Sequence, residues 1–192
     1  MQPINTAADP KSVFMTSFGL WKQNMGQLVI LTLLLLLLCW IPLVNLVLCA
    51  GYVRCILRLC RGEQFETADM FRAWDCFVPL LTYAVILVLA SILLSIIPIV
   101  GIPVASVLSA IAMPGFIAVT EHRLGAIDAF KWSFNTLLDD PVGWLIALVL
   151  SSVLSSLGAL FFGLGALFTL PLAAIIYTSQ YLKHLPVIQV KQ

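Results

Sequence analysis

The stretch LVILTLLLLLLCWIPLVNLVLCAGYVRCILRLCR, residues 28–61, decides the fold class. The chain is almost continuously apolar from Gln27 to Arg61. One straight helix of this length would be about 50 Å long, whereas the hydrocarbon core of a bilayer is about 30 Å thick. The stretch therefore predicts two membrane-spanning helices folded back on each other, with the turn between Pro42 and Asn45.

Two further apolar runs follow the same plan. One covers residues 77–120 and contains an Ile-Pro-x-x-Gly turn at 97–101, and the other covers 142–181 with a glycine-rich turn at 161–165. Each run is too long for one span and long enough for two. The sequence thus predicts an all-α, polytopic membrane helical bundle of three hairpins. The six predicted spans are residues 22–41, 44–61, 77–97, 102–120, 141–161 and 166–183.

The composition agrees with a chain that lies in a bilayer. Of the 192 residues, 61% are hydrophobic and only 10% are charged, whereas a soluble domain carries about 25% charged residues. The first apolar segment begins near Leu28 and no small-residue cleavage site follows it, which favours an anchor over a cleaved signal. The net charge of +1 gives no support for a nucleic-acid partner.

Prolines mark further features of the predicted helices. Asp9-Pro10 and Asp140-Pro141 each place a possible N-cap carboxylate before a proline at the first helical position, so a helix is expected to begin at each. Pro114 lies inside the fourth predicted span. We expect it to kink that helix, with neighbouring helices satisfying the carbonyls that it leaves free.

An amphipathic stretch precedes each hairpin. Apolar residues recur there at helical spacing, and the charged residues lie off the apolar face. The apolar residues are Phe14, Phe18 and Trp21 in the first stretch, Phe65, Ala68, Phe71 and Trp74 in the second, and Ile127, Phe130, Phe134 and Leu137 in the third. Such helices lie in the membrane interface with their aromatic rings at headgroup depth. The alternative is that these faces pack against neighbouring spans.

The unit of interfacial helix, span, turn, span and polar loop occurs three times. A repeat of this kind favours duplication of a helical hairpin, and the successive copies keep the same orientation because each contains two spans. The predicted repeats are residues 11–63, 64–124 and 125–184 of a single membrane domain, 11–184. Tails are predicted on either side: the loose N-terminal residues 1–10 and the C-terminal residues 185–192.

All charged residues fall on one side of this topology. The ten basic residues are Lys11, Lys22, Arg54, Arg58, Arg61, Arg72, Arg123, Lys131, Lys183 and Lys191. They lie at the termini or in and beside the two long loops, with the nine acidic residues on the same side, and the three tight turns contain no charge. The positive-inside rule then places both termini in the cytoplasm.

Three arginines in the second predicted span are the first candidate site. Arg54, Arg58 and Arg61 share a helix face, and Arg54 lies about 10 Å deeper than Arg61. A charge at that depth is a functional hypothesis: the stripe could contact anionic lipid headgroups or line a cytoplasm-facing cavity. The alternative is that the long side chains lift their guanidinium groups towards the headgroups without a further role.

The second candidate is a cytoplasmic contact site at the end of the fourth predicted span. Glu121, His122 and Arg123 are expected in a solvated loop, where the histidine could titrate near neutral pH. One histidine beside one glutamate does not make a metal site, which needs three or four ligands. No motif predicts a catalytic, cofactor-binding or metal-binding residue, and no cofactor is expected.

Several short motifs resemble one group of bacterial membrane proteins. They are Arg61-Gly62-Glu63, Asp69-Met70-Phe71, the Ile-Pro-x-x-Gly turn, and the segment from Gly163 to Tyr181. Over residues 12–184 the chain resembles the YciC-like proteins and the membrane domain attached to some glycerophosphodiesterases. The resemblance implies a multi-helix protein of the bacterial inner membrane. It implies no activity.

These observations favour a non-enzymatic scaffold or accessory protein that engages lipids or partners from the cytoplasmic side. Loops 61–77 and 121–141 are the expected contact surfaces, and anionic lipids, a membrane-protein partner or a second copy of the chain are the expected partners. The alternative is a transporter or channel for a lipid, small molecule or ion. Its conduction path would use the serines of the fifth span, which otherwise serve helix packing. They are Ser151, Ser152, Ser155 and Ser156.

Overall fold

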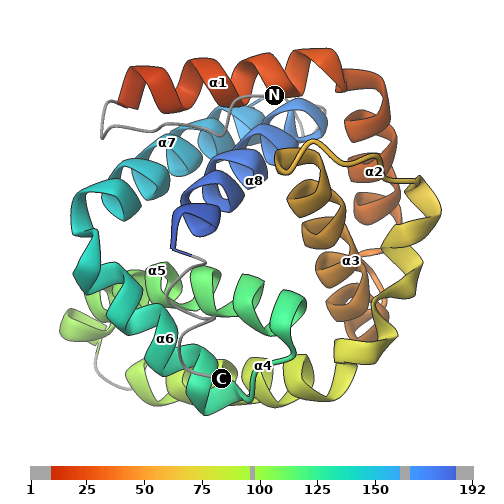
Figure 1. Cartoon of the computed structure of the whole chain (residues 1–192). Coiled ribbons are helices and arrows are strands. Elements are labelled where there is room, and N and C mark those ends of the chain that lie inside the picture. Colours follow the sequence, from red (N-terminus) through yellow and green to blue (C-terminus); the bar gives the residue numbers. More distant parts are fainter. Residues whose placement is uncertain (1–9, 96–97, 161–164, 185–192) are drawn as a thin grey trace.

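The computed structural model describes residues 10–95, 98–160 and 165–184, and every regular element within them is a helix (Figure 1). The all-α prediction is confirmed. The helices are α1 (Pro10–Gln23), α2 (Met25–Leu38), α3 (Pro42–Cys60), the 3-10 helix η1 (Thr67–Cys76), α4 (Phe77–Ser95), α5 (Pro98–His122), α6 (Ala126–Asp139), α7 (Pro141–Leu160) and α8 (Ala166–Lys183).

The helices pack as neighbouring pairs around a central one. The pairs α2–α3, α4–α5 and α7–α8 are each in contact, and η1 lies along α3. Helix α8 contacts α1, α2, α3, α5 and α7, and it contributes the fully buried residues Ile175, Ile176 and Tyr181. The last hairpin in sequence therefore closes the bundle against the first (Figure 1).

Two helices in the described residues are long and apolar enough to cross a membrane by themselves. They lie within residues Thr67–Leu93 and Pro141–Gly158. A third candidate combines α1 and α2, which are bent by 88° where they meet at Asn24. Large apolar side chains are exposed on α2, α4 and α7, as expected of surfaces that face lipid.

The polar ends of the helices lie together on one face of the bundle. Side-chain contacts join the start of α2 to the segment after α3, and they join the ends of α3, α5 and α8 to one another and to the starts of α4 and α7. The contacts are Gln27 with Phe65, Arg61 with Glu121, Cys60 with Ser179, Asp75 with Arg123, and Gln180 with Asp140. Each pair of neighbouring helices thus begins and ends on the same face.

The predicted position of the first turn is wrong. Ile41 is extended, with φ −101° and ψ 101°, and Pro42 is the first residue of α3. Pro98 likewise begins α5, so residues 98–101 are helical, while residue 97 lies outside the described residues. Proline suits the first helical position because its missing N–H needs no partner there, and it holds the preceding residue extended. Residues 161–164 of the third predicted turn also lie outside the described residues.

The amphipathic stretches form helices, but their packing faces differ from the predicted ones. In η1 the buried residues are Met70, Ala73 and Cys76, three apart as in a 3-10 helix, whereas Phe71 and Trp74 are exposed. The buried residues of α6 are small: Ala126, Ala129, Ser133 and Thr136. Phe71 and Trp74 of η1 and Phe134 of α6 are exposed, which is the arrangement expected at a membrane interface.

Side chains of α4 and α6 bond to backbone carbonyls of α5 near Pro114. Pro114 has no N–H, so the carbonyl that it leaves without a helical donor is that of Ala110, and the predicted kink stays a prediction. The side-chain hydrogen bonds go to the next two carbonyls: Tyr83 of α4 donates to the carbonyl of Ala112 at 2.9 Å, and Ser133 of α6 donates to that of Ile111. These bonds also fix α4 and α6 against α5.

Candidate functional site

Close packing of η1 on α3 builds the candidate site. A Cβ atom at Gly51 of α3 would overlap the carbonyl of Met70 in η1. Glycine therefore lets the backbone of η1 lie directly on α3, in the turn just before Arg54. The close approach brings the carboxylates of η1 to the arginine stripe of α3.

Arg54 joins three elements through one guanidinium group. Its Nη1 and Nη2 donate to the two carboxylate oxygens of Asp75, at 2.7 and 2.9 Å. Its Nε and Nη2 both donate to the carbonyl of Thr120, at 3.0 and 2.9 Å, near the C-terminus of α5. The side chain is 25% exposed. A bidentate pair with a carboxylate is the strongest geometry available to arginine, and a cation at a helix C-terminus is favoured by the helix dipole.

Arg123 completes this pair from the other side. It follows α5 in the left-handed region, with φ 54°, and its N–H donates to the carbonyl of Val119, so that it closes the helix. Its Nε donates to Asp75 at 2.9 Å. Asp75 therefore holds two guanidinium groups, one from α3 and one from the segment after α5.

A second carboxylate organises the outer part of the site. Asp69 accepts from Arg58 at 2.7 Å and from Arg72 at 3.0 Å. It also accepts from the N–H of Glu66, which forms the capping box of η1. Asp69 thus fixes the start of η1 and holds two arginines at the surface.

Glu121 and His122 do not lie in a solvated loop, so that prediction is wrong for them. Helix α5 continues through His122, and both side chains are partly buried. Glu121 forms an ion pair with Arg61, and Nε2 of His122 lies 3.6 Å from its other carboxylate oxygen. Arg123 is exposed, as expected of a loop residue.

Asp140 organises the opposite end of the same face and is the N-cap of α7, as the sequence predicts. It accepts from the N–H of Gly143 at 2.9 Å and from the side-chain amide of Gln180 at 2.6 Å. Burial by itself would raise the pKa of this carboxyl, but the two hydrogen bonds, together with the nearby His184 and Lys183, outweigh it and lower the pKa. Burial also lowers the pKa of the neighbouring His184.

Several buried polar atoms lie between α5, α6, α7 and α8, beneath the ionic residues. Within the part of the chain that the structure describes, they have no hydrogen-bond partner: Nε1 of Trp132 and Trp144, the hydroxyl of Tyr181, and Nε2 of His122 and His184. Buried atoms of this kind usually bind ordered water. The described residues contain no group of three or more histidine, cysteine or carboxylate side chains that could hold a metal ion.

Sequence reasoning identified the arginines but missed their partners. Asp69 lies in the second amphipathic stretch, off its apolar face, and Asp75 directly follows that stretch; nothing in the local pattern distinguishes either from a solvated charge. The one available signal was their number and proximity: two carboxylates follow the arginine stripe within a short loop, on the same side of the membrane. The structure shows that they pair with Arg54, Arg58, Arg72 and Arg123.

No protein-family model, no curated protein and no solved structure matches this chain. The resemblance to the YciC-like group therefore stays a prediction.

Proposed function

We propose that this protein is a six-span protein of the bacterial inner membrane that acts as a non-enzymatic scaffold or accessory protein. In this proposal it engages anionic lipid headgroups and membrane partners through its cytoplasmic face. The observation that carries the proposal is a group of exposed side chains beside the ionic network of α3, η1 and α5. The group, called the rim below, consists of Arg72, Arg123, Phe71 and Trp74.

The six-span arrangement is supported by the shared face of the helix ends. In this arrangement α2, α3, α4, α5, α7 and α8 cross the bilayer in alternating directions, and α1, η1 and α6 lie at its surface. Side-chain contacts that bring the start and end of each helix pair together support this alternation. Helix α3 is less hydropathic than α4 because it carries Arg54 and Arg58, and both of them bond towards the polar face.

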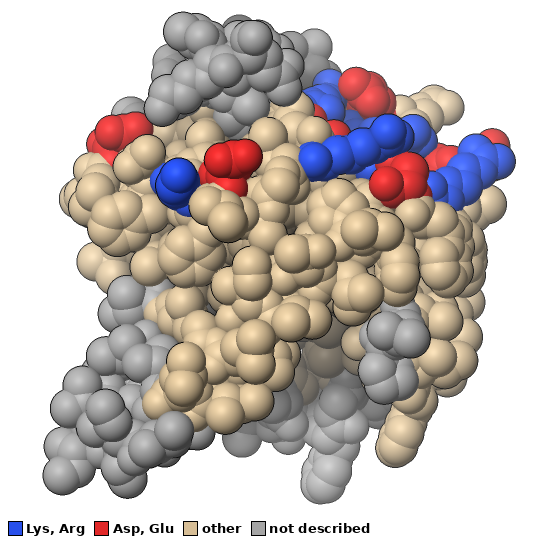
Figure 2. Space-filling view, turned by 90° about the horizontal axis from the view of Figure 1, so that it is seen from below, with Lys and Arg blue, Asp and Glu red and all other residues tan. Residues whose placement is uncertain are grey.

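The distribution of charge supports the orientation. Figure 2 shows the charged side chains gathered in a band along one edge of the molecule, above a broad surface without charge. A bilayer would accept the uncharged surface, and the charged edge would remain in water or among headgroups. The arginine-rich band would face the cytoplasm by the positive-inside rule.

The rim itself is suited to a membrane surface. The paired network contains five arginines and three carboxylates, so it carries an excess of two positive charges. The side chains of Arg72 and Arg123 are 73% and 62% exposed, and Phe71 and Trp74 are exposed on the same short helix as Arg72. Guanidinium groups can hold phosphate in a bidentate manner, and aromatic rings favour the headgroup region.

Two observations weigh against the transport alternative. Arg54 has its hydrogen-bond partners inside the protein, which leaves it poorly suited to a moving ion or substrate. Of the four serines in α7, Ser151 is buried against α8, while Ser152, Ser155 and Ser156 are exposed on the apolar outer surface. The three exposed serines share a face that points away from the bundle, so they do not line a path between its helices.

The topology is tested by thiol labelling in intact cells and inverted vesicles, on a background without the five native cysteines. Single cysteines at Glu63 and Leu124 are expected to react only from the cytoplasmic side. Cysteines at Trp40, which is exposed between α2 and α3, and at Gly101 are expected to react only from the outer side. Labelling of Trp40 or Gly101 variants from the cytoplasm would show re-entrant hairpins and end the six-span proposal.

The role of the rim is tested by lipid retention. The purified protein is equilibrated with mixtures of phosphatidylglycerol and phosphatidylcholine, and the retained lipid is measured by mass spectrometry. We expect enrichment of the anionic lipid in the wild type and its loss in the Arg72→Gln/Arg123→Gln variant. Lys131→Gln removes a cation of α6 outside the network and is the matched control. Equal retention by all three proteins would refute lipid binding by the rim.

A further inference from the structure

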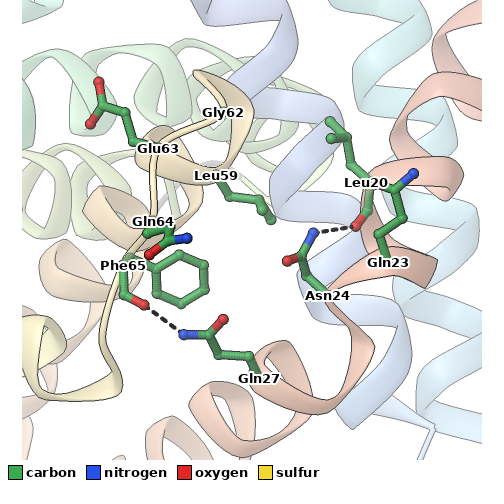
Figure 3. A pocket seen from close by; sticks show the side chains of 9 residues that line it. All are labelled: Leu20, Gln23, Asn24, Gln27, Leu59, Gly62, Glu63, Gln64 and Phe65. Carbon is green, nitrogen blue, oxygen red and sulfur yellow. Dashed lines mark hydrogen bonds between the residues drawn. The ribbon is translucent and has the colours of Figure 1, made fainter. Parts of the chain in front are cut away.

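A cavity of about 400 Å³ lies where the bend between α1 and α2 faces the segment after α3 (Figure 3). One wall comes from the end of α1 and the start of α2, and the other from the end of α3 and residues 62–65. The lining residues are Leu20, Gln23, Asn24, Gln27, Leu59, Gly62, Glu63, Gln64 and Phe65. Gly62 takes a positive φ of 77°, which turns the chain at this wall. The cavity opens on the polar face of the bundle, beside the helix ends described above.

Two side-chain amides are held so that their oxygen atoms face the cavity. The amide nitrogen of Asn24 donates to the carbonyl of Leu20 at 3.1 Å, and that of Gln27 donates to the carbonyl of Phe65 at 2.6 Å. Because a backbone carbonyl only accepts, each bond fixes which end of the amide is nitrogen. The two oxygens are left to point into the space between the walls, as Figure 3 shows.

The other lining residues also bear on which ligand the cavity could hold. Gln64 turns its amide towards the same space beside the ring of Phe65. Glu63 also lines the cavity, but its carboxylate is turned away from the two amide oxygens in Figure 3, and none of the described lining residues is a lysine, arginine or histidine. A cavity with two fixed acceptors, an aromatic ring and no cation among its described lining residues favours a hydrogen-bond donor with positive charge.

We propose that this cavity binds the primary ammonium group of a lipid headgroup, of the phosphatidylethanolamine type. The inference rests on the proposed membrane location, which puts the cavity at headgroup depth. The ammonium group would donate to the oxygens of Asn24 and Gln27, and Leu20 and Leu59 would contact the apolar part of the lipid. A quaternary headgroup has the same charge but no N–H to donate, so it does not fit the fixed acceptors.

The test measures lipids retained by the purified full chain from equimolar phosphatidylethanolamine and phosphatidylcholine, by native mass spectrometry. We expect preferential retention of the ethanolamine lipid, on the order of tenfold, because the choline lipid loses charge-assisted hydrogen bonds. Soluble ethanolamine in excess should displace the bound lipid only weakly, because it lacks the apolar contacts. Equally effective displacement by the soluble amine would overturn the lipid assignment.

Two variants locate the effect. Gln64→Leu removes an amide that forms no hydrogen bond with the described residues, so the fold is retained and the preference should fall several-fold. Asn135→Leu, at an exposed amide on α6 away from the cavity, should leave it unchanged. An equal affinity for the two lipids in the wild type, with the topology mapping intact, would overturn the cavity inference alone. Failure of the wild type to bind phosphatidylglycerol would instead overturn only the proposal that the rim binds anionic lipid.

Discussion

Replacement of Arg54 by glutamine should destabilise the protein more than the loss of any other single arginine. The substitution removes a bidentate pair with Asp75 and two hydrogen bonds to the carbonyl of Thr120. Breaking a buried pair costs about 3–5 kcal/mol and an exposed one about 0–1 kcal/mol. Since the side chain is 25% exposed, we expect a loss of about 2–3 kcal/mol in the free energy of unfolding, which is roughly 4–12 °C in Tm for a domain of this size.

The assay is thermal unfolding of the purified protein in detergent, followed by intrinsic tryptophan fluorescence. Arg54→Lys keeps the charge but cannot form the bidentate pair, so it should recover only part of the stability. Asp75→Asn should lose a similar amount, and the double variant should lose less than the sum of the two. A change in Tm below about 1 °C for Arg54→Gln would show a solvated side chain and refute the reasoning. Rapid labelling of a cysteine at position 54 by a water-soluble reagent would point to an aqueous cavity.

Two other substitutions test local features. Gly51→Ala should cost about 1–3 kcal/mol, because the added methyl group forces η1 away from α3 at Met70; Gly26→Ala, with open space around the new Cβ atom, should be neutral or stabilising in the same unfolding assay. Asp140→Asn tests the pH dependence of stability. The folded protein lowers the pKa of Asp140. The stabilisation that this carboxylate contributes is therefore complete above the unfolded pKa of about 4 and is lost as the pH falls through the lower folded value. Between about pH 5 and pH 2 the Tm of the wild type should therefore fall further than the Tm of the variant. Equal decreases in Tm for the two proteins over this range would contradict the prediction.

The sequence predicted the helices well because their signals are local. Long apolar runs, N-cap carboxylates and prolines at the first helical position act within a few residues of each helix end. Asp140 and Pro141 illustrate this, since the predicted N-cap and helix start are both observed. The first turn was misplaced because Pro42 was assigned to the turn, although the same rule would have put it at the start of α3.

The packing faces could not be predicted from apolar periodicity. In a soluble protein a large apolar side chain gains by leaving water, so the apolar stripe marks the core. At a membrane surface lipid offers the same environment, and close packing of small residues decides which face is buried. Ala73 of η1 and Ala129 of α6 are accordingly buried, while Phe71 and Trp74 are exposed. The pairing of Arg54 with Asp75 and Thr120 was also beyond the sequence, because it depends on the close approach that Gly51 allows.

Folding and function should be separable within the arginine cluster. Arg54 has its partners inside the bundle and contributes to holding α3, η1 and α5 together. Arg72 lies on the exposed side of η1, and its ion pair with Asp69 at the surface is worth about 0–1 kcal/mol. A rim that binds headgroups should therefore lose its lipid preference with Arg72→Gln at nearly unchanged Tm, whereas Arg54→Gln should lower Tm first. If both variants changed stability and lipid binding in the same proportion, the rim would be part of the fold only, and the contact surface would have to be sought elsewhere on the polar face.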